Sequence, residues 1–164
     1  MTDFAKDLLA WYQEHGRKNL PWQSSPPDIY HVWLSEIMLQ QTQVATVVDY
    51  FNNFIISFPT IAELANADEE EVLTSWSGLG YYSRARNLHK SAKIILSEYQ
   101  GIFPASYSEL IALPGIGEST AGAILSLACS HSRPILDGNV KRVLSRYHRV
   151  VGYYGDSKAL KELW

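Results

Sequence analysis

The sequence predicts an all-α domain. Apolar residues recur at three- and four-residue spacing along most of the chain, which is the period of a helix with one buried face. Signals that start or stop helices follow one another closely. Hydrophobic residues make up 46% of the 164 positions, so the chain can bury one sizeable core. The stretches 133–136 and 149–154 have some strand character, but they lack partner strands, so we expect extended connections there.

An N-terminal helix and a proline-rich loop precede the other predicted helices. Apolar side chains at helical spacing predict an amphipathic helix over Phe4–Glu14, and three prolines predict a loop over Arg17–Pro27. Further helices are expected, in order, at His31–Gln41, Val44–Phe58, Ile61–Asn66, Glu69–Trp76, Tyr82–Tyr99, Tyr107–Ala112, Glu118–Ser130, Val140–Tyr147 and from Lys158 onward.

Two residue pairs have the spacing of a helix capping box. Thr60 with Glu63, and Ser106 with Glu109, each combine a hydroxyl with a carboxyl three residues later. In that arrangement the side chains and backbone N–H groups at the helix start satisfy one another. The pairs therefore support helices that begin directly after Thr60 and Ser106.

The charge distribution leaves nucleic-acid binding open. A formal net charge of −3 argues mildly against it, because proteins that neutralise many phosphates are usually basic overall. Basic residues nevertheless cluster in two predicted helices, and each cluster is either a DNA-facing surface or an ordinary solvated helix face. The first comprises Arg84, Arg86, His89, Lys90 and Lys93, and the second Lys141, Arg142, Arg146, His148 and Arg149.

The single cysteine and the hydropathy pattern limit the protein class. Cys129 can form no internal disulfide and cannot build a thiolate metal site alone, so we expect a small core residue and no metal site in this stretch. No apolar run approaches the roughly 20 residues that span a bilayer, and the N-terminus lacks the pattern of a signal peptide. We expect a cytoplasmic protein without a membrane segment.

The segment Leu113–Gly117, with sequence LPGIG, predicts a tight hairpin between two helices. Gly115 and Gly117 permit a turn that exposes N–H groups at the start of the next helix, where an anion can bind. An ordinary helix-to-helix turn is the alternative. The small and apolar residues that follow Ser119 suit a closely buried helix, which favours a phosphate-gripping helix-hairpin-helix.

Two carboxylates are candidates for catalysis. Glu36 shares a helix face with Val32, Trp33 and Leu39, and these apolar neighbours should favour its neutral form. A protonated acid is what glycosidic cleavage needs, because the departing base must receive a proton. The alternatives are a surface residue or a buried ion pair.

Asp137 stands where an apolar stretch ends and a helix is expected to begin. A plain N-cap is the simple interpretation of the sequence Asp-Gly-Asn. A carboxylate held there by N–H groups would also stabilise an oxocarbenium-like sugar, or bond to it transiently. Sequence spacing does not show whether Asp137 meets Glu36.

Two helix boundaries carry side chains suited to a DNA stack. Gln41 and Thr42 lie at the end of one predicted helix, and Leu79 and Tyr81 lie in a glycine-containing turn before another. Amides and aromatic rings on turns can replace an extruded base, although each segment alone also fits a simple turn or a half-buried aromatic.

Four ordered motifs together resemble the MutY family of adenine DNA glycosylases, over most of the chain from about Trp11. The motifs are WLSEIMLQQTQV (33–44), GLGYYSRARNL (78–88), LPGIG (113–117) and LDGNVKRVL (136–144). The resemblance implies an all-α helix-hairpin-helix glycosylase fold, with a six-helix bundle module and an incomplete second helical module within residues 1–164. It implies base excision repair: adenine mispaired with 8-oxoguanine or guanine in double-stranded DNA is flipped out and removed by hydrolysis.

The resemblance also implies the catalytic residues. Glu36 would protonate adenine and later help to activate water. Asp137, assisted by Asn139, would stabilise or capture the sugar cation.

Further residues are implied to contact DNA. Gln41 and Tyr81 would enter the helix near the lesion, Thr42 and Leu79 would approach the 8-oxoguanine partner, and Trp22 would border the adenine pocket. The hairpin at 113–117, including Leu113, Gly115 and Gly117, would hold the DNA backbone.

Ser119 separates the chain from the endonuclease III-type enzymes that it also resembles. Those enzymes carry a lysine there that forms a Schiff base with the sugar, and a serine cannot do so. We therefore expect a monofunctional glycosylase without efficient strand cleavage.

Family members usually have four downstream cysteines that hold a 4Fe–4S cluster, followed by a domain that helps to read 8-oxoguanine. Neither region is in this sequence. We expect a C-terminally truncated, monomeric fragment that acts on the bacterial nucleoid. Two alternatives stay open: an endonuclease III-like pyrimidine glycosylase, and a non-catalytic helix-hairpin-helix DNA-binding module.

Overall fold

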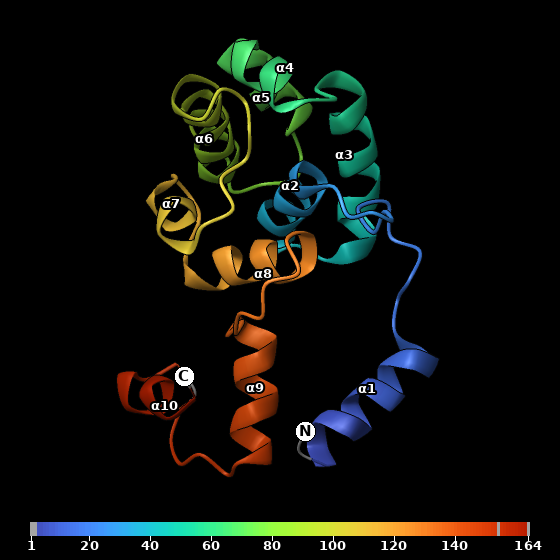
Figure 1. Cartoon of the computed structure of the whole chain (residues 1–164), viewed down its shortest axis with the longest axis vertical. Helices are drawn as coiled ribbons and strands as arrows, with labels where there is room; N and C mark the ends of the chain where they lie inside the picture. The colour runs from blue at the N-terminus through green and yellow to red at the C-terminus, as the bar shows by residue number, and fades with distance from the viewer. Residues whose placement is uncertain (1–2, 154, 164) are drawn as a thin grey trace.

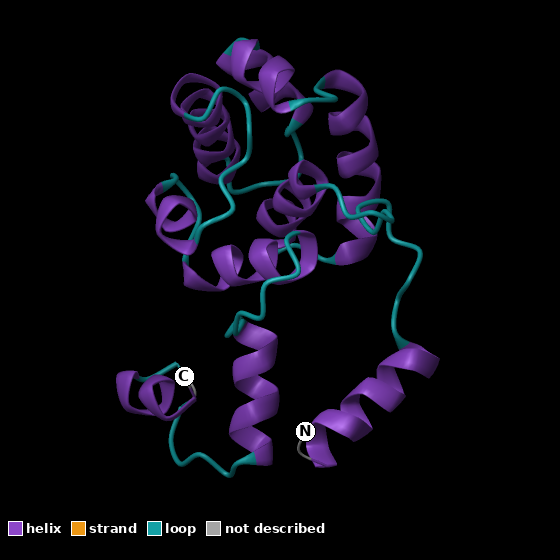
Figure 2. Ribbon diagram, in the orientation of Figure 1, coloured by secondary structure: helices purple, strands orange, loops and turns teal. Residues whose placement is uncertain are grey.

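The computed structural model describes residues 3–153 and 155–163, and it confirms the all-α prediction. The described residues form helices and loops, with no strand among them (Figures 1 and 2). The helices are α1 (Asp3–His15), α2 (Ile29–Leu39), α3 (Val44–Ser57), α4 (Ile61–Asn66), α5 (Glu69–Ser75), α6 (Ser83–Glu98), α7 (Tyr107–Ala112), α8 (Glu118–Ala128), α9 (Gly138–Tyr147) and α10 (Ser157–Leu163).

Helix α2 lies at the centre of a body formed by α2–α8 (Figure 1). It packs against α3, α6 and α8, while α6 also packs against α4 and α5. Most of α2 is apolar, and its side chains Trp33, Leu34 and Met38 are fully buried. A helix that is apolar around most of its circumference is stable only when other elements surround it. The composition of α2 therefore accounts for its central place.

Helices α1, α9 and α10 stand apart from this body (Figure 1). Neither α1 nor α9 contains a buried residue, and α9 packs against α10. The rings of Phe4 in α1 and Tyr147 in α9 lie 4.2 Å apart, so the first helix meets the C-terminal part of the chain. The outer helices consequently contribute little apolar burial of their own.

Side-chain caps set the helix starts. Asp28 accepts hydrogen bonds from the N–H groups of Tyr30 and His31, so α2 begins two residues before the predicted His31. The Thr60 hydroxyl accepts from the N–H of Glu63 at 3.2 Å and donates to its carboxylate at 2.9 Å. In the predicted capping box the Glu63 carboxylate would accept from the backbone N–H of Thr60. Here it accepts from the Thr60 hydroxyl instead.

Burial corrects the interpretation of the first basic cluster. Arg84 and His89 are buried, and only Arg86, Lys90 and Lys93 are exposed. His89 lies within hydrogen-bond distance of the carbonyl oxygen of Ala67, at 3.0 Å, and burial lowers its pKa. The helical spacing alone did not distinguish this inward face from a solvated one.

The described helices are all too short or too polar to cross a lipid bilayer.

Candidate active site

Glu36 lies in a pocket of about 310 Å³ between α1, the loop after it, α2 and the end of α8. That volume is at the lower end of the range for small-molecule sites. Trp22 is buried beside the pocket, with its ring edge-on to Phe51 at 5.3 Å between centroids. The pocket is lined by Tyr12, Lys18, Trp22, Gln23, Ser24, Pro27, Val32, Ser35, Glu36 and Leu127.

The surroundings of Glu36 hold its carboxyl group near neutrality. Burial and, to a smaller extent, the negative charge of Asp137 raise the pKa of Glu36 from its ordinary value to about 7. Val32, one of the apolar helix neighbours that favoured a neutral Glu36 from sequence, is buried and lines the same pocket. An acid with a pKa near the pH of the cell can both donate and accept a proton.

The second carboxylate, Asp137, is close enough to influence Glu36 electrostatically. It is exposed and caps α9, where its Oδ1 accepts a hydrogen bond from the N–H of Val140 at 2.7 Å. The N-cap interpretation is therefore correct, and it is compatible with a role beside Glu36. Because Asp137 caps it, α9 begins at Gly138 and not at the predicted Val140.

Asn139 lies in the first turn of α9 and is exposed. Its side-chain oxygen accepts a hydrogen bond from Arg142 at 3.0 Å. In this conformation Asn139 interacts with its own helix.

An extended strap, residues 133–136, runs along α8 and leads into Asp137, whose charge acts on Glu36. Ser119 Oγ accepts from the N–H of Leu136 at 3.2 Å, and Ser126 Oγ bonds both backbone groups of Arg133. Gly122 lies between these serines, and a Cβ there would overlap the carbonyl oxygen of Pro134. The small residues at positions 119, 122 and 126 therefore form a track for the strap.

The predicted hairpin joins α7 and α8. Gly115 has φ +79° and a Cβ there would lie 2.9 Å from the Cβ of Asn87, so both its conformation and its space favour glycine. Ser91 Oγ donates to the carbonyl of Pro114 at 2.8 Å, and Leu113 is buried. Gly117 is the N-cap of α8, whose first N–H groups lack helical acceptors. The turn is thus held from inside by α6 and can present N–H groups outward.

The two predicted stack-entering turns lie next to each other around Arg84. Gln41 and Tyr81 are both exposed, at φ 60° and 50°. The Arg84 guanidinium donates to Thr42 Oγ1 in the first turn and to the carbonyl of Leu79 in the second. Sequence reasoning placed Arg84 on a basic surface and missed this role. No local pattern signalled it, because its partners in the first turn and at the end of α2 lie more than 40 residues away in the chain.

Leu79 differs from the other side chains of these turns. Its side chain is 6% exposed and belongs to the core. Any approach of this residue to DNA would therefore involve its backbone.

A family profile described as HhH-GPD superfamily base excision DNA repair protein matches residues 34–164. The chain belongs to the HhH-GPD superfamily. The matched region contains Glu36, the 113–117 hairpin and Asp137.

Named relatives support this assignment. The chain is 54% identical over 161 residues to an adenine DNA glycosylase of Buchnera aphidicola subsp. Acyrthosiphon pisum, covering 98% of this chain and 46% of that protein. It is 41% identical over 172 residues to human adenine DNA glycosylase, covering 100% of this chain and 31% of the human protein. The chain thus spans less than half the length of these relatives.

Solved structures of HhH-GPD enzymes have the same fold. A thermostable thymine-DNA glycosylase matches with a TM-score of 0.84 and 26% identity, covering 98% of this chain and 74% of the other. Endonuclease III in a non-covalent DNA complex matches with a TM-score of 0.78 and 21% identity, covering 100% and 78%. The second likeness concerns the fold alone.

The 4Fe–4S cluster implied by the family resemblance has no ligand set in the described part of the chain. No group of three or more metal-binding side chains occurs there, and Cys129, half-buried against the core, cannot supply four thiolates. The described residues therefore do not fit the cluster.

Several pocket residues were not anticipated from the sequence. Lys18 and Gln23 come from the proline-rich loop, and Leu127 comes from the end of α8. Tyr12 reaches the pocket from α1, a helix without buried residues. Residues on loops and helix ends carry no periodic signal, so only the folded chain shows that they share one pocket.

Proposed function

We propose that this chain carries the catalytic part of an adenine DNA glycosylase that hydrolyses the bond between a flipped adenine and deoxyribose. The proposal depends on one observation: Glu36 lines a pocket, and burial together with the negative charge of Asp137 raises its pKa to about 7. Enzymes that cleave glycosidic bonds usually have two carboxyl groups, one acting as the acid and the other as a base, nucleophile or charge stabiliser. The names of the relatives direct the choice of base to adenine.

In the proposed reaction, protonated Glu36 donates its proton to the adenine ring as the C1′–N9 bond breaks. The bonding electrons leave with adenine, and positive charge develops on the sugar. Asp137 carries the opposite charge and stabilises that cation, or bonds to C1′ transiently. Water then adds to C1′, and the Glu36 carboxylate accepts its proton, which restores the acid. The products are free adenine and an abasic site.

Double-stranded DNA with adenine opposite 8-oxoguanine or guanine is the proposed substrate. A base must leave the stack before it can enter a pocket of this kind. Exposed Gln41 and Tyr81 can fill the resulting gap, and the 113–117 hairpin can bind the phosphate backbone. Such a protein would act as a monomer on DNA in the cytoplasm or nucleoid.

Ser119 supports base removal without strand cleavage. Its hydroxyl accepts a hydrogen bond from the Leu136 N–H, and a hydroxyl forms no Schiff base. An endonuclease III-like enzyme would instead release oxidised pyrimidines, so parallel assays on adenine opposite 8-oxoguanine and on thymine glycol separate the two activities. A non-catalytic DNA-binding module would release neither base.

Replacing Glu36 tests the proposed function directly. Glu36→Gln keeps the shape of the side chain but removes the transferable proton. We expect adenine release under single-turnover conditions to fall at least about 100-fold, since general acid–base catalysis contributes roughly 10²–10⁴-fold. Duplex affinity, measured by fluorescence anisotropy, should change little.

The protein from the complete reading frame is used for this test, and Glu98→Gln, at an exposed position on α6, is the matched control. Unchanged turnover in the Glu36→Gln variant would remove Glu36 from the mechanism. A parallel loss of turnover in the control would point to a general effect of charge.

A further inference from the structure

Arg84 caps the C-terminal end of α2 from a different helix. One guanidinium nitrogen donates to the carbonyl oxygens of Ile37 at 3.1 Å, Met38 at 2.6 Å and Gln40 at 2.6 Å. Carbonyl groups at the end of a helix lack intrahelical donors and carry partial negative charge. A buried cation there satisfies both needs. It fixes the backbone immediately before Gln41.

The second guanidinium nitrogen bonds the two turns beyond that helix end. It donates to Thr42 Oγ1 at 3.2 Å, and to the carbonyls of Leu79 at 3.3 Å and Gly80 at 3.1 Å. One planar group thus binds segments 40–42 and 79–80 simultaneously. Two nitrogens in a fixed fork are required, and arginine is the residue that provides them.

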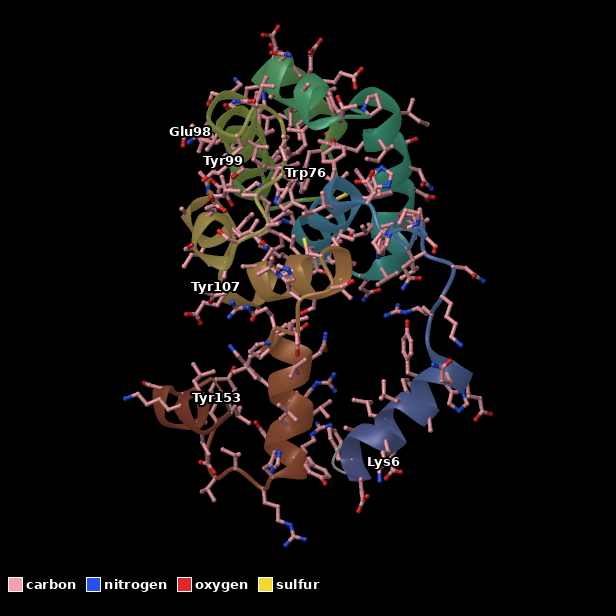
Figure 3. The ribbon with its side chains drawn as sticks, viewed as in Figure 1. Lys6, Trp76, Glu98, Tyr99, Tyr107 and Tyr153 are labelled. Carbon is pink, nitrogen blue, oxygen red and sulfur yellow. The ribbon has the colours of Figure 1, made fainter. Side chains whose placement is uncertain are left out.

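Two aromatic rings contact the Arg84 guanidinium. Its carbon lies 5.5 Å from the centroid of Trp76 and 5.4 Å from that of Tyr81, and the residue as a whole is 7% exposed. Trp76, labelled in Figure 3 within the helical body, also donates through its indole N–H to the carbonyl of Gly80 at 3.1 Å. The Tyr81 turn is therefore fixed by Arg84 and Trp76 together.

Backbone conformation shows that these turns need such support. Gln41 and Tyr81 have φ values of 60° and 50°, in the left-handed region that residues with a Cβ rarely adopt. Gly80, whose carbonyl oxygen accepts from both Arg84 and Trp76, has φ +76°. Residues persist in such conformations where surrounding interactions over-determine them. Arg84 supplies interactions to both turns.

We propose that Arg84 is a positioning residue that fixes the Gln41 and Tyr81 turns as one rigid unit facing duplex DNA. The proposal rests on the proposed function for the direction in which the unit faces. The unit is also tied toward the active site, since Gln40 Nε2 lies 3.5 Å from Thr120 Oγ1, next to Ser119. With Arg84 intact, the side chains of Gln41 and Tyr81 enter the base stack together.

Hydrogen exchange tests the coupling without reference to activity. Three amides report on the turns, those of Thr42, Leu79 and Arg84 itself, which bond to Leu39, Trp76 and Tyr81. In Arg84→Met, which keeps a long apolar side chain and loses every donor, exchange should rise more than about tenfold in both turns. In Arg84→Lys the rise should be smaller, because one ammonium cannot satisfy both turns.

The matched control is Arg86→Met, two residues along the same helix, where the arginine is half-exposed and pairs with Glu69 at 3.5 Å. In Arg86→Met, amide hydrogen exchange in both turns should equal that of the unsubstituted protein. Amides of α3 report global stability in every variant. A rise in only one turn after Arg84→Met would overturn the coupling. An equal rise in α3 and the turns in both Arg84 variants would also overturn it, by making Arg84 a general core residue.

A second measurement uses duplex DNA with 2-aminopurine next to the target adenine. Arg84→Met should lower the fluorescence change that reports base extrusion by at least about tenfold while duplex affinity stays within about twofold. Arg84→Lys should recover part of the signal. Full extrusion by the Arg84→Met variant would overturn the positioning role. If both turns respond in the exchange experiment while the unsubstituted protein releases no adenine, the coupling holds and the proposed function fails.

Discussion

At the scale of single residues, Glu36 and Asp137 show how position decides the behaviour of chemically similar groups. Glu36 is half-buried on an apolar helix face, and burial raises its pKa to about 7. Asp137 is exposed at a helix N-terminus and accepts an N–H bond. Helical spacing predicted the surroundings of Glu36, because residues three and four positions apart share a face. The electrostatic influence of Asp137 on Glu36 was not predictable, because no local pattern connects the two residues.

The pKa of Glu36 predicts a pH dependence of base release. The proposed acid works in its protonated form, which is fully populated well below pH 7 and is lost as pH rises through about 7. We expect the single-turnover rate to decline about tenfold per pH unit above that value. A rate profile between pH 5 and pH 9 measures this decline.

Asp137→Asn checks whether the decline in rate above pH 7 reports the deprotonation of Glu36. Removing the negative charge that helps to raise the pKa of Glu36 should move the decline to lower pH, whatever the height of the profile. A decline at the same pH in this variant would assign it to another group.

At the scale of secondary-structure elements, the packing of the strap on α8 determines where Asp137 lies. Residues 119, 122 and 126 are small, and each one meets the strap. The sequence indicated a closely buried helix from the small and apolar residues of segment 119–124, and Ala121, Gly122 and Ala123 are indeed buried. It did not indicate that an extended segment, rather than another helix, covers them. Small residues permit close approach of any backbone, whichever element supplies it.

Gly122→Ala tests the track on α8. Its Cβ would overlap the carbonyl oxygen of Pro134, so the strap must shift and carry Asp137 with it. We expect the free energy of unfolding to fall by about 1–3 kcal/mol, the usual effect of overpacking. Urea denaturation measures this loss, and adenine release should fall in parallel.

Gly138→Ala is the control for that substitution, because nothing lies within 4 Å of a Cβ at position 138. Its stability should stay within about 0.5 kcal/mol of the unsubstituted protein. Equal stability of the Gly122→Ala variant and this control would mean that the strap tolerates a larger separation from α8.

At the scale of the whole molecule, the helices fall into two groups of different burial. The body formed by α2–α8 contains almost all of the buried apolar side chains, whereas α1 and α9 contain none (Figure 1). The candidate site lies where the groups meet, since Tyr12 of α1 lines the pocket and Asp137 caps α9. Movement of the outer helices would therefore change the site directly.

This division predicts two levels of hydrogen exchange in the 164-residue chain. Amides of α2, α6 and α8 should exchange only through opening of the whole body, while those of α1 and α9 should exchange at least about tenfold faster. The cause is the lack of buried side chains on the outer helices. Hydrogen exchange measured by mass spectrometry tests this prediction. Equal protection of the inner and outer helices would contradict it.

Periodicity, caps and neighbours within one or two turns sufficed to predict the helices, their ends to within two residues and the apolar helix face that carries Glu36. The folded chain was needed to learn that Asp137 influences Glu36, that loop residues complete the pocket, and that Arg84 is buried between two turns. Those facts depend on contacts between segments far apart in the chain. Such contacts arise from how whole helices bury their apolar faces, and this is a property of the assembled core.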